Sequence, residues 1–308
     1  MITRRQFIKY IGASFVAGIG GAGYAFGIEP LIRLGVSRYR LTPKGWPTGL
    51  KLKIAALSDF HISQPWLSLD RLATIIDRTN ELRADLIVLL GDYSAGISIR
   101  TGEIHSHQWA PLFGRLQAPL GVHAILGNHD WWHDRTAQKT GTGPTFGQLA
   151  LKKAGIPVYE NEAIRLNNNG MPFWLLGLGD QLALRADHAN RIRHPQAKNR
   201  GRWLGRDDLT GTIDKITDDA PAILLAHEPD IFVDVPSRIS LTLSGHTHGG
   251  QVRLAGWSPV VPSYYGNRFA YGHVVENDRH LIVSGGLGTS ILPVRFGIPP
   301  EIVLVELG

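Results

Sequence analysis

Short, mainly apolar runs that stop abruptly at polar residues recur along this chain. The runs are three to five residues long, and each is followed by Gly, Ser, Asn, Asp or His. Runs of this length, bounded by glycine and polar turns, are typical of buried β-strands. The runs are residues 54–57, 86–90, 124–126, 223–226 and 241–243, and the polar clusters that follow them are residues 58–61, 91–92, 127–130, 227–228 and 244–248.

Helical patterns lie between the predicted strands. Leu69, Leu72, Ile75, Ile76 and Leu82 recur at the spacing of an amphipathic helix. Strands that alternate with helices predict an α/β fold in which helices cover the sheets. Further helices are predicted at 108–116, 145–154 and 205–216, and strands at 51–58, 85–91, 121–126, around Val158 and Ile164, at 173–178, before His227 and His246, and at 281–284 and 301–306.

The polar clusters at the strand ends contain the side chains that bind metals. Strands of one sheet that end in such residues bring them to one edge, where open α/β sheets place their sites. The chain has no cysteine, so disulfides and thiolate sites are excluded and any metal must be held by oxygen and imidazole. The candidate ligands are Asp59, His61, Asp92, Asn128, His227, His246 and His248.

Seven ligands exceed the four that one tetrahedral zinc takes. They suit two six-coordinate ions that share a carboxylate, and this donor set favours Mn²⁺, Fe or Zn²⁺ over Ca²⁺. Asp59 and His61 are two residues apart, as are His246 and His248. Residues at this spacing in an extended chain point the same way. Two such ions support phosphoryl transfer from a phosphate-ester substrate.

Charge is concentrated at the N-terminus. Residues 1–53 hold nine Lys or Arg and one acid, Glu29, whereas the remainder holds 23 basic and 25 acidic residues. The formal net charge of +6 therefore comes from a basic tail on a near-neutral body. This distribution indicates targeting or attraction to a membrane surface and argues against nucleic acid as a partner.

Residues 3–9, with Arg4 and Arg5, resemble a twin-arginine export signal, since a mildly apolar stretch from Ile11 to Phe26 follows them. We therefore expect residues 1–26 to engage the twin-arginine export machinery. The stretch is short for a span of about 18–20 residues, so a cleaved signal and a retained N-terminal membrane anchor both stay open. The expected location is the periplasm or the outer face of the cytoplasmic membrane. The proline-containing residues 27–50 predict a linker to one domain at 51–308.

The ordered set of motifs resembles the signature of calcineurin-like metallophosphoesterases. Residues 285–290, 292–297 and 300–303 are similar to a bacterial subgroup of phosphodiesterases with twin-arginine signals, the YkuE/YaeI-like enzymes. The resemblance implies a four-layer α/β/β/α sandwich of two mixed β-sheets flanked by helices. The matching motifs are Asp59-x-His61, Gly91-Asp92, residues 127–130, His227 and residues 245–248.

The resemblance also implies roles for single residues. Asp59, His61 and His248 bind one metal, and Asp92 bridges to the other. A hydroxide held between the metals attacks phosphorus. His129 is the candidate catalytic residue, as general acid or as electrostatic stabiliser, and Asp130 either orients it or caps a turn. The second metal is bound by Asn128, His227 and His246.

Substrate choice stays open. The resemblance implies a small or lipid-linked phosphodiester or pyrophosphate, and one alternative is a UDP-2,3-diacylglucosamine pyrophosphatase of lipid A synthesis. An inactive scaffold on the same fold is a further alternative, although every expected ligand position is filled. Residues 93–96 lack the arginine of protein phosphatases, which argues against phosphoproteins. The basic stretch at 183–206 is either a solvated loop or a clamp for an anionic substrate.

Overall fold

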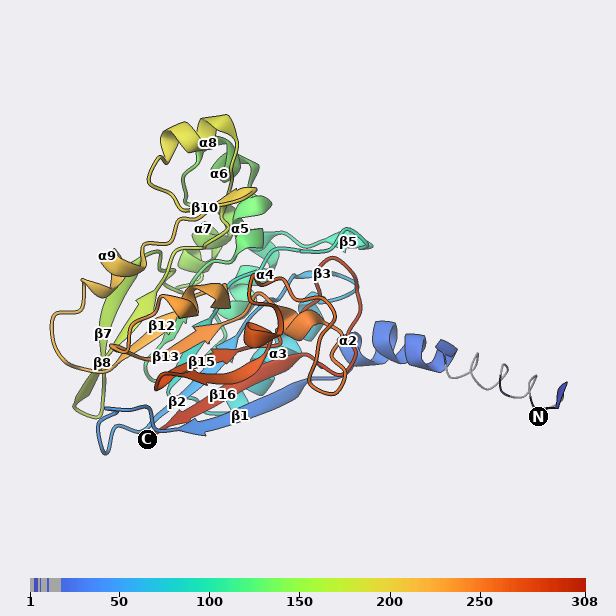
Figure 1. Cartoon of the computed structure of the whole chain (residues 1–308), viewed down its shortest axis with the longest axis horizontal. Helices are drawn as coiled ribbons and strands as arrows, with labels where there is room; N and C mark the ends of the chain where they lie inside the picture. Colours follow the sequence, from blue (N-terminus) through green and yellow to red (C-terminus); the bar gives the residue numbers. More distant parts are fainter. Residues whose placement is uncertain (1–2, 5, 7–9, 11–17) are drawn as a thin grey trace.

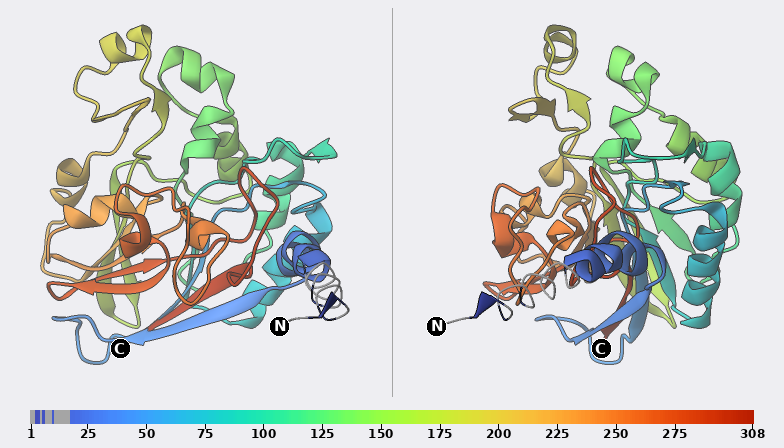
Figure 2. Two further views of the ribbon diagram at one scale, coloured as in Figure 1. Left: turned by 45° about the vertical axis from the view of Figure 1, so that its right-hand side comes forward. Right: turned by 90° about the vertical axis from the view of Figure 1, so that its right-hand side faces the viewer.

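Two mixed β-sheets lie face to face, and helices cover their outer faces (Figure 1). The computed structural model describes residues 3–4, 6, 10 and 18–308. Figure 2 shows the same layers from two further directions. This arrangement confirms the predicted four-layer α/β/β/α sandwich. Half of the predicted export signal at residues 1–26, including Arg5, lies outside the described residues.

The first sheet has five strands in the order β1-β16-β2-β4-β6. Strands β2, β4 and β6 are parallel to one another, β16 is antiparallel to β2, and β1 is parallel to β16. The carboxyl ends of the three parallel strands therefore meet at one edge. The strands are β1 (Gly35–Leu41), β2 (Leu52–Leu57), β4 (Leu86–Leu89), β6 (Val122–Ala124) and β16 (Glu301–Leu307).

The second sheet has six strands in the order β14-β15-β13-β12-β8-β7. Its four central strands are parallel, and the two outer strands are antiparallel to their neighbours. Strands β12 and β13 therefore also end together. The strands are β7 (Glu162–Asn168), β8 (Met171–Gly177), β12 (Ala222–Leu225), β13 (Ile239–Ser244), β14 (Gly272–Glu276) and β15 (Arg279–Val283).

Alternate residues of each central strand are buried on opposite faces. In β2, Ala55 and Leu57 pack under the helices, whereas Ile54 and Ala56 pack between the two sheets. Because both faces are covered, these strands are mainly apolar instead of alternating strictly between apolar and polar residues. Helices α3 (Leu69–Glu81), α4 (Ser106–Phe113) and α7 (Phe146–Lys153) cover the first sheet, and α9 (Leu209–Ile213), η2 (Pro229–Val233) and η4 (Gly266–Phe269) cover the second.

Short elements complete the described part of the chain. Among these residues, no helix is both long and apolar enough to cross a bilayer. The remaining elements are η1 (Tyr24–Ile28), α2 (Glu29–Leu31), β3 (Ser63–Gln64), β5 (Gly102–Glu103), α5 (Asn128–Trp132), α6 (Arg135–Thr140), β9 (Leu184–Arg185), α8 (His188–Arg193), β10 (Asn199–Arg200), β11 (Trp203–Leu204) and η3 (His248–Gly250).

The segment predicted as a linker differs from the prediction. Residues 35–41 form β1, whose seven residues all pair with β16. The strand was hard to recognise because it lies at the sheet edge, is only partly buried, and carries Arg38 and Arg40 on exposed positions. Upstream, the buried carboxylate of Glu29 accepts a hydrogen bond of 2.7 Å from the amide of Ile298. Residues 29–41 are therefore part of the folded body.

The basic stretch at 183–206 has defined secondary structure and projects at the top of Figure 1 with α6 and α8. Strands β9, β10 and β11 form a small antiparallel sheet. Arg200 pairs with the buried Asp207 at 2.7 Å, and Arg206 pairs with Glu160 and lies over the ring of Trp131. At least these two arginines serve the fold, so the description as a simple solvated loop does not apply to them.

Candidate metal centre

Five strands deliver polar side chains to one place. Strands β2, β4 and β6 of the first sheet, and β12 and β13 of the second, each end just before one of the sequence clusters. The structure brings all seven predicted ligands together, and six of them are almost completely buried. Those six are Asp59, His61, Asp92, Asn128, His227 and His248.

The first group of donors contains Asp59, His61 and His248. Nε2 of His248 lies 3.4 Å from Oδ1 of Asp59 and 3.0 Å from Nε2 of His61. The other ring nitrogen of His61 is 3.0 Å from the carbonyl oxygen of Ser94. A histidine whose Nδ1 is held by a carbonyl presents Nε2 as the free donor, which is the usual arrangement of metal-binding histidines.

The second group contains Asn128, His227 and His246. Oδ1 of Asn128 lies 2.9 Å from Nδ1 of His246. Nδ1 of His227 is held by the carbonyl of Leu90 at 2.7 Å, whereas its buried Nε2 faces Oδ2 of Asp92 at 3.3 Å but makes no well-aligned hydrogen bond. A buried polar atom with no partner is unfavourable unless something else binds there. Nε2 of His227 therefore points to an additional ligand.

Asp92 lies between the two groups. Its Oδ2 is 3.5 Å from Nε2 of His61 and 3.3 Å from Nε2 of His227. Two ligands of one cation at bond lengths of about 2.1 Å are about 3.0–3.4 Å apart. The donor separations are within about 0.1 Å of this spacing on both sides of Asp92. The residues present therefore fit two cations that share one carboxylate.

Most of these residues have an unusual backbone. Asp59, His61, Asp92, His246 and His248 all have positive φ values, between 45° and 69°. A side chain in this left-handed region costs about 1–2 kcal/mol per residue. Such outliers concentrate where function requires a fixed geometry. Five strained residues at one centre indicate that the fold holds these donors in a backbone conformation that is locally unfavourable.

Burial dominates the electrostatics of the centre. Burial raises the pKa of Asp92 to about 7 and also raises the pKa of Asp59. Burial lowers the pKa of His61 and His246 to about 3, which keeps these rings in the neutral form that binds metals. Burial acts to lower the pKa of His227, but Asp92 and Asp59 raise it well above its usual value. Cations at the centre would compensate the buried carboxylates.

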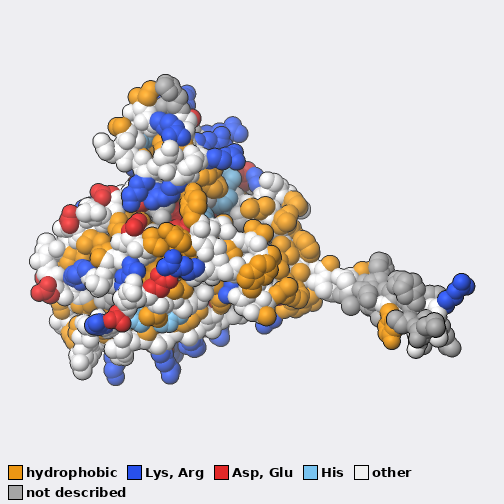
Figure 3. All heavy atoms as spheres, in the orientation of Figure 1, with side chains coloured by type: hydrophobic (Ala, Val, Ile, Leu, Met, Phe, Trp, Pro, Cys, Tyr) orange, Lys and Arg blue, Asp and Glu red, His pale blue; other side chains and the backbone are white. Residues whose placement is uncertain are grey.

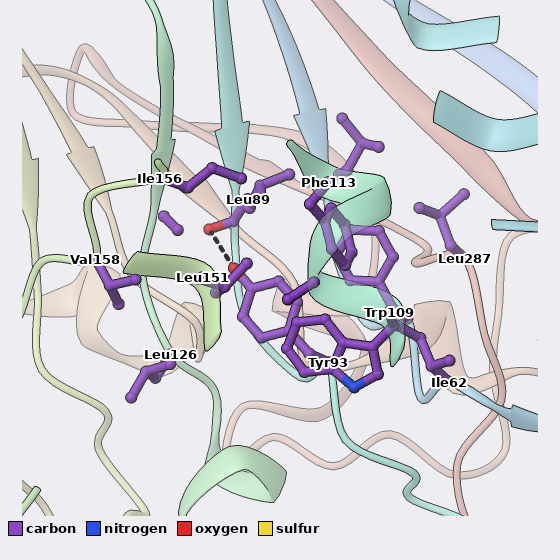
Figure 4. Close-up of a cluster of buried hydrophobic side chains, with 14 of the residues drawn as sticks. Ile62, Leu89, Tyr93, Trp109, Phe113, Leu126, Leu151, Ile156, Val158 and Leu287 are labelled. Atoms are coloured by element: carbon purple, nitrogen blue, oxygen red, sulfur yellow. Dashed lines mark hydrogen bonds between the residues drawn. The ribbon is translucent and has the colours of Figure 1, made fainter. Parts of the chain in front are cut away.

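An aromatic cluster behind the centre fixes two of its loops (Figure 4). Phe60, between two ligands, stacks on Tyr93, and Tyr93 stacks on Trp109. The hydroxyl of Tyr93 donates to the carbonyl of Ile125 at 3.1 Å. Because Tyr93 directly follows Asp92, this packing sets the positions of both the β2 and the β4 loop.

Close backbone approach requires glycine at the strand ends. A Cβ on Gly245 would overlap Oγ of Ser58 and lie 2.5 Å from Oδ2 of Asp59. A Cβ on Gly96 would lie 2.6 Å from Nδ1 of His61. Residues 94–96 are small and lie in the loop that lacks the arginine of protein phosphatases. They therefore leave room for the His61 ring.

The carboxylate of Asp130 holds the loop after Asp92 in place, and it does not orient the ring of His129. Its carboxylate accepts hydrogen bonds from the amides of Asp92, Tyr93 and Ser94, and from Gly127. Of the two roles considered for Asp130, the structural one therefore agrees with these contacts.

His129 lies beside the donors, with its ring 4.8 Å from that of His61. Its Nδ1 is 3.1 Å from Nε2 of His133.

Trp131 is buried in the core, whereas Trp132 lines the clefts above the centre. His105 and His107 lie with His133 around a separate polar recess.

Three buried charged residues at the centre were not predicted. Asp180, which follows β8, and Glu228 each have one carboxylate oxygen without a partner. Glu228 follows His227 directly and could have been found from the strand-end pattern. Arg295 is fully buried, donates to the carbonyls of Gly288 and Ile298, and places Nη2 3.4 Å from Nδ1 of His248.

Comparison with known proteins agrees with this geometry. The sequence pattern described as "Calcineurin-like phosphoesterase" matches residues 52–250. The chain is 32% identical over 317 residues to the uncharacterized metallophosphoesterase YkuE of Bacillus subtilis (strain 168), covering 99% of this chain and 98% of that protein.

Two further relatives match over most of their length. An uncharacterized metallophosphoesterase of Aquifex aeolicus (strain VF5) is 27% identical over 274 residues, covering 89% of this chain and 92% of that protein. The phosphodiesterase YaeI of Escherichia coli (strain K12) is 27% identical over 316 residues and covers 100% of both. With the family pattern spanning the strands that carry the site, the chain belongs to the calcineurin-like phosphoesterases, hydrolases that act on phosphoester bonds.

Proposed function

We propose that this protein is a phosphodiesterase that hydrolyses a small or lipid-linked phosphodiester or pyrophosphate with two divalent metal ions, Mn²⁺, Fe or Zn²⁺. The observation that carries the proposal is the position of Oδ2 of Asp92 between two groups of converging donors. Asp59, His61 and His248 would hold one ion. Asn128, His227 and His246 would hold the other.

When bound, such ions supply an activated water and neutralise charge on the phosphoryl oxygens. The protein's own residues then orient the substrate and stabilise the leaving group. Nδ1 of His129 is engaged with His133, so Nε2 is the atom available to the substrate. Burial lowers the pKa of His129 well below its usual value. The neutral ring would therefore act as a hydrogen-bond donor to a phosphoryl or leaving oxygen.

Two observations favour a diester over a monoester. The cleft directly above the centre is lined by no Lys or Arg side chain among the described residues. A monoester carries about 1.5–2 negative charges at neutral pH, whereas a diester has a single ionised oxygen and therefore less charge for the protein to match. The relative YaeI is named a phosphodiesterase. A cleft lined by no Lys or Arg suits the substrate with less charge.

Hydrolysis of a substrate panel tests the proposal. The full chain is loaded with Mn²⁺, Fe²⁺ or Zn²⁺ and given bis(p-nitrophenyl) phosphate, p-nitrophenyl phosphate, cyclic nucleotides and UDP-2,3-diacylglucosamine. We expect kcat/KM for the diester to exceed that for the monoester by at least about tenfold. Cleavage of the monoester alone would contradict the proposal.

Two alternatives are resolved by the same panel. Selective cleavage of UDP-2,3-diacylglucosamine would identify the pyrophosphatase of lipid A synthesis. Absence of hydrolysis with every metal would identify an inactive scaffold, although every ligand position carries a metal-binding side chain.

We further propose that the protein is exported by the twin-arginine route and acts at the outer face of the cytoplasmic membrane or in the periplasm. The support is the order of Arg4, Arg5 and the apolar stretch that follows. This route carries folded proteins, which suits an enzyme that acquires its metals before export.

A further inference from the structure

A cleft with aliphatic walls lies directly over the metal centre. It encloses about 380 Å³, and its floor includes Asp92, Asn128, His246 and His248. One wall includes Val252, Val260 and Pro262, and the other includes Ile291, Leu292 and Val294. Apart from the floor and His129, the lining contains no charged or titratable side chain. The walls are therefore chemically distinct from the metal-binding floor.

The aliphatic side chains on the walls are exposed. Val260 is 73% exposed, Ile291 is 76% exposed and Leu292 is 49% exposed. Single exposed aliphatic residues are common, but several around one cleft mark a surface that binds an apolar group. Figure 3 shows hydrophobic side chains gathered on the side of the molecule from which the N-terminal segment leaves.

Ile291 is held in a backbone conformation that isoleucine disfavours. Its φ is +63°, and its amide donates to the carbonyl of Gly96 at 3.1 Å. Glycine or asparagine suits this left-handed conformation far better than a β-branched residue does. An exposed isoleucine contributes little to the core, so the fold does not explain its presence. Strain of this kind is typical of residues that serve a binding site.

We propose that this cleft binds the hydrocarbon chain of an amphiphilic phosphodiester. This inference rests on the proposed function, because a phosphate at the cleft floor directs one of its two ester groups along the aliphatic walls. A nucleoside is a poorer match, since the two walls carry aliphatic side chains and offer no charged partner. Trp132 also lines this cleft, but its ring already stacks on Trp203, with ring centroids 4.0 Å apart.

The test uses p-nitrophenyl alkyl phosphates whose alkyl group is methyl, butyl or octyl, each below its micelle concentration, with the Mn²⁺-loaded full chain. Burial of one methylene changes an equilibrium by up to about fourfold. We therefore expect kcat/KM to rise by about two- to fourfold per methylene from methyl to butyl, and further with octyl. Equal values for methyl and octyl esters would overturn the inference.

Substitutions assign the effect to the cleft. Ile291→Asn removes the aliphatic group and suits the left-handed backbone, and Val260→Ser removes the facing one. In both variants the octyl-to-methyl ratio of kcat/KM should fall severalfold toward one. Val275→Ser is the matched control, because Val275 is 53% exposed on β14 and does not line the cleft. A ratio that stays at the wild-type value in both cleft variants would also refute the inference.

A binding measurement separates this inference from the proposed function. Calorimetry with methyl and octyl methylphosphonate monoesters reports chain length without turnover. Tighter binding of the octyl compound, together with no hydrolysis of any diester, would reject the phosphodiesterase and support the cleft assignment. A further comparison of dispersed octyl substrate with substrate in phosphatidylglycerol vesicles distinguishes a free amphiphile from a membrane lipid as the source of the chain.

Discussion

Oδ1 of Asp92 accepts a hydrogen bond of 2.8 Å from the main-chain nitrogen of His129. One carboxylate oxygen is therefore fixed by the first turn of α5, and Oδ2 alone faces the nitrogens of His61 and His227. Because the same atom faces both donor groups, a single substitution at Asp92 should affect both cation sites.

Asp92→Asn keeps an oxygen for the His129 amide but removes the charge that the two sites share. We expect bound metal to fall from two ions per chain and kcat/KM for the diester to fall by more than about 100-fold. Metal content after dialysis and turnover measure the two effects. Asp77→Asn on the exposed face of α3 is the control and should change neither.

In the metal-free protein, Asp92→Asn should increase the stability of the folded state. Burial raises the pKa of Asp92 to about 7, so the folded chain retains a proton that the unfolded chain loses near pH 4. The contribution of Asp92 to stability is therefore present below about pH 4 and is lost as the pH rises to 7. After chelation at pH 8, Asp92→Asn should have a higher Tm than the wild type. A lower Tm there would contradict the electrostatic description of the centre.

His129→Ala removes the hydrogen-bond donor beside the centre. Loss of one such donor lowers kcat by about 10²–10³-fold. Because the ring is neutral, we expect similar losses for p-nitrophenyl and phenyl esters, with the metal content unchanged. If the loss were much larger for the phenyl ester, His129 would be a proton donor to the leaving oxygen instead.

Gly245→Ala places a methyl group against Ser58 and Asp59. The displaced carboxylate should lose its position opposite His248, so we expect weaker binding of the first metal and a loss of activity that high Mn²⁺ partly restores. Gly27→Ala is the control, since a Cβ there meets no atom within 4 Å. Titration of activity with Mn²⁺ compares the two variants, and equal midpoints would refute the steric argument.

Glu29→Ala tests the attachment of the N-terminal segment to the folded body. The substitution leaves the amide of Ile298 without its acceptor, which costs roughly 1–3 kcal/mol of unfolding free energy. Urea denaturation measures the change. Glu81→Ala, on an exposed ion pair, should change the free energy by less than about 0.5 kcal/mol. If the two variants were equally stable, residues near Glu29 would not belong to the body.

Changing Arg4 and Arg5 together to lysine should abolish export through the twin-arginine machinery. The protein would then accumulate in the cytoplasm as a folded, metal-binding chain. Cell fractionation with an antibody against the folded body measures its distribution. The control is the double change Arg33→Lys and Arg38→Lys, which keeps the same net charge. Unchanged export of the Arg4/Arg5 variant would show that another route is used.

The sequence predicted the central strands and the candidate donors because both follow from strong local signals. A buried strand is mainly apolar, and an abrupt change to Asp or His marks its end, as at Asp59 and Asp92. Strand β1 lacked this signal because edge strands alternate charged and partly buried residues. Its place in the sheet depends on β16, about 270 residues away in sequence.

Features of the site that depend on loops were not predictable in the same way. Val260 and Ile291 come from irregular segments, which have no periodicity to reveal that they face one cleft. The left-handed backbone at five predicted ligands is imposed by surrounding packing and is not a preference of Asp or His. The pairing of His129 with His133 instead of Asp130 likewise depends on how α5 is placed.

Strand β16 lies between β1 and β2, so residues 301–307 hold β1 in the first sheet. During synthesis β1 emerges from the ribosome about 270 residues before the strand that it pairs with. A polypeptide that stops before residue 301 would leave the edges of β1 and β2 unpaired, and unpaired edges invite aggregation. Truncation upstream of β16 should therefore expose two strands at once.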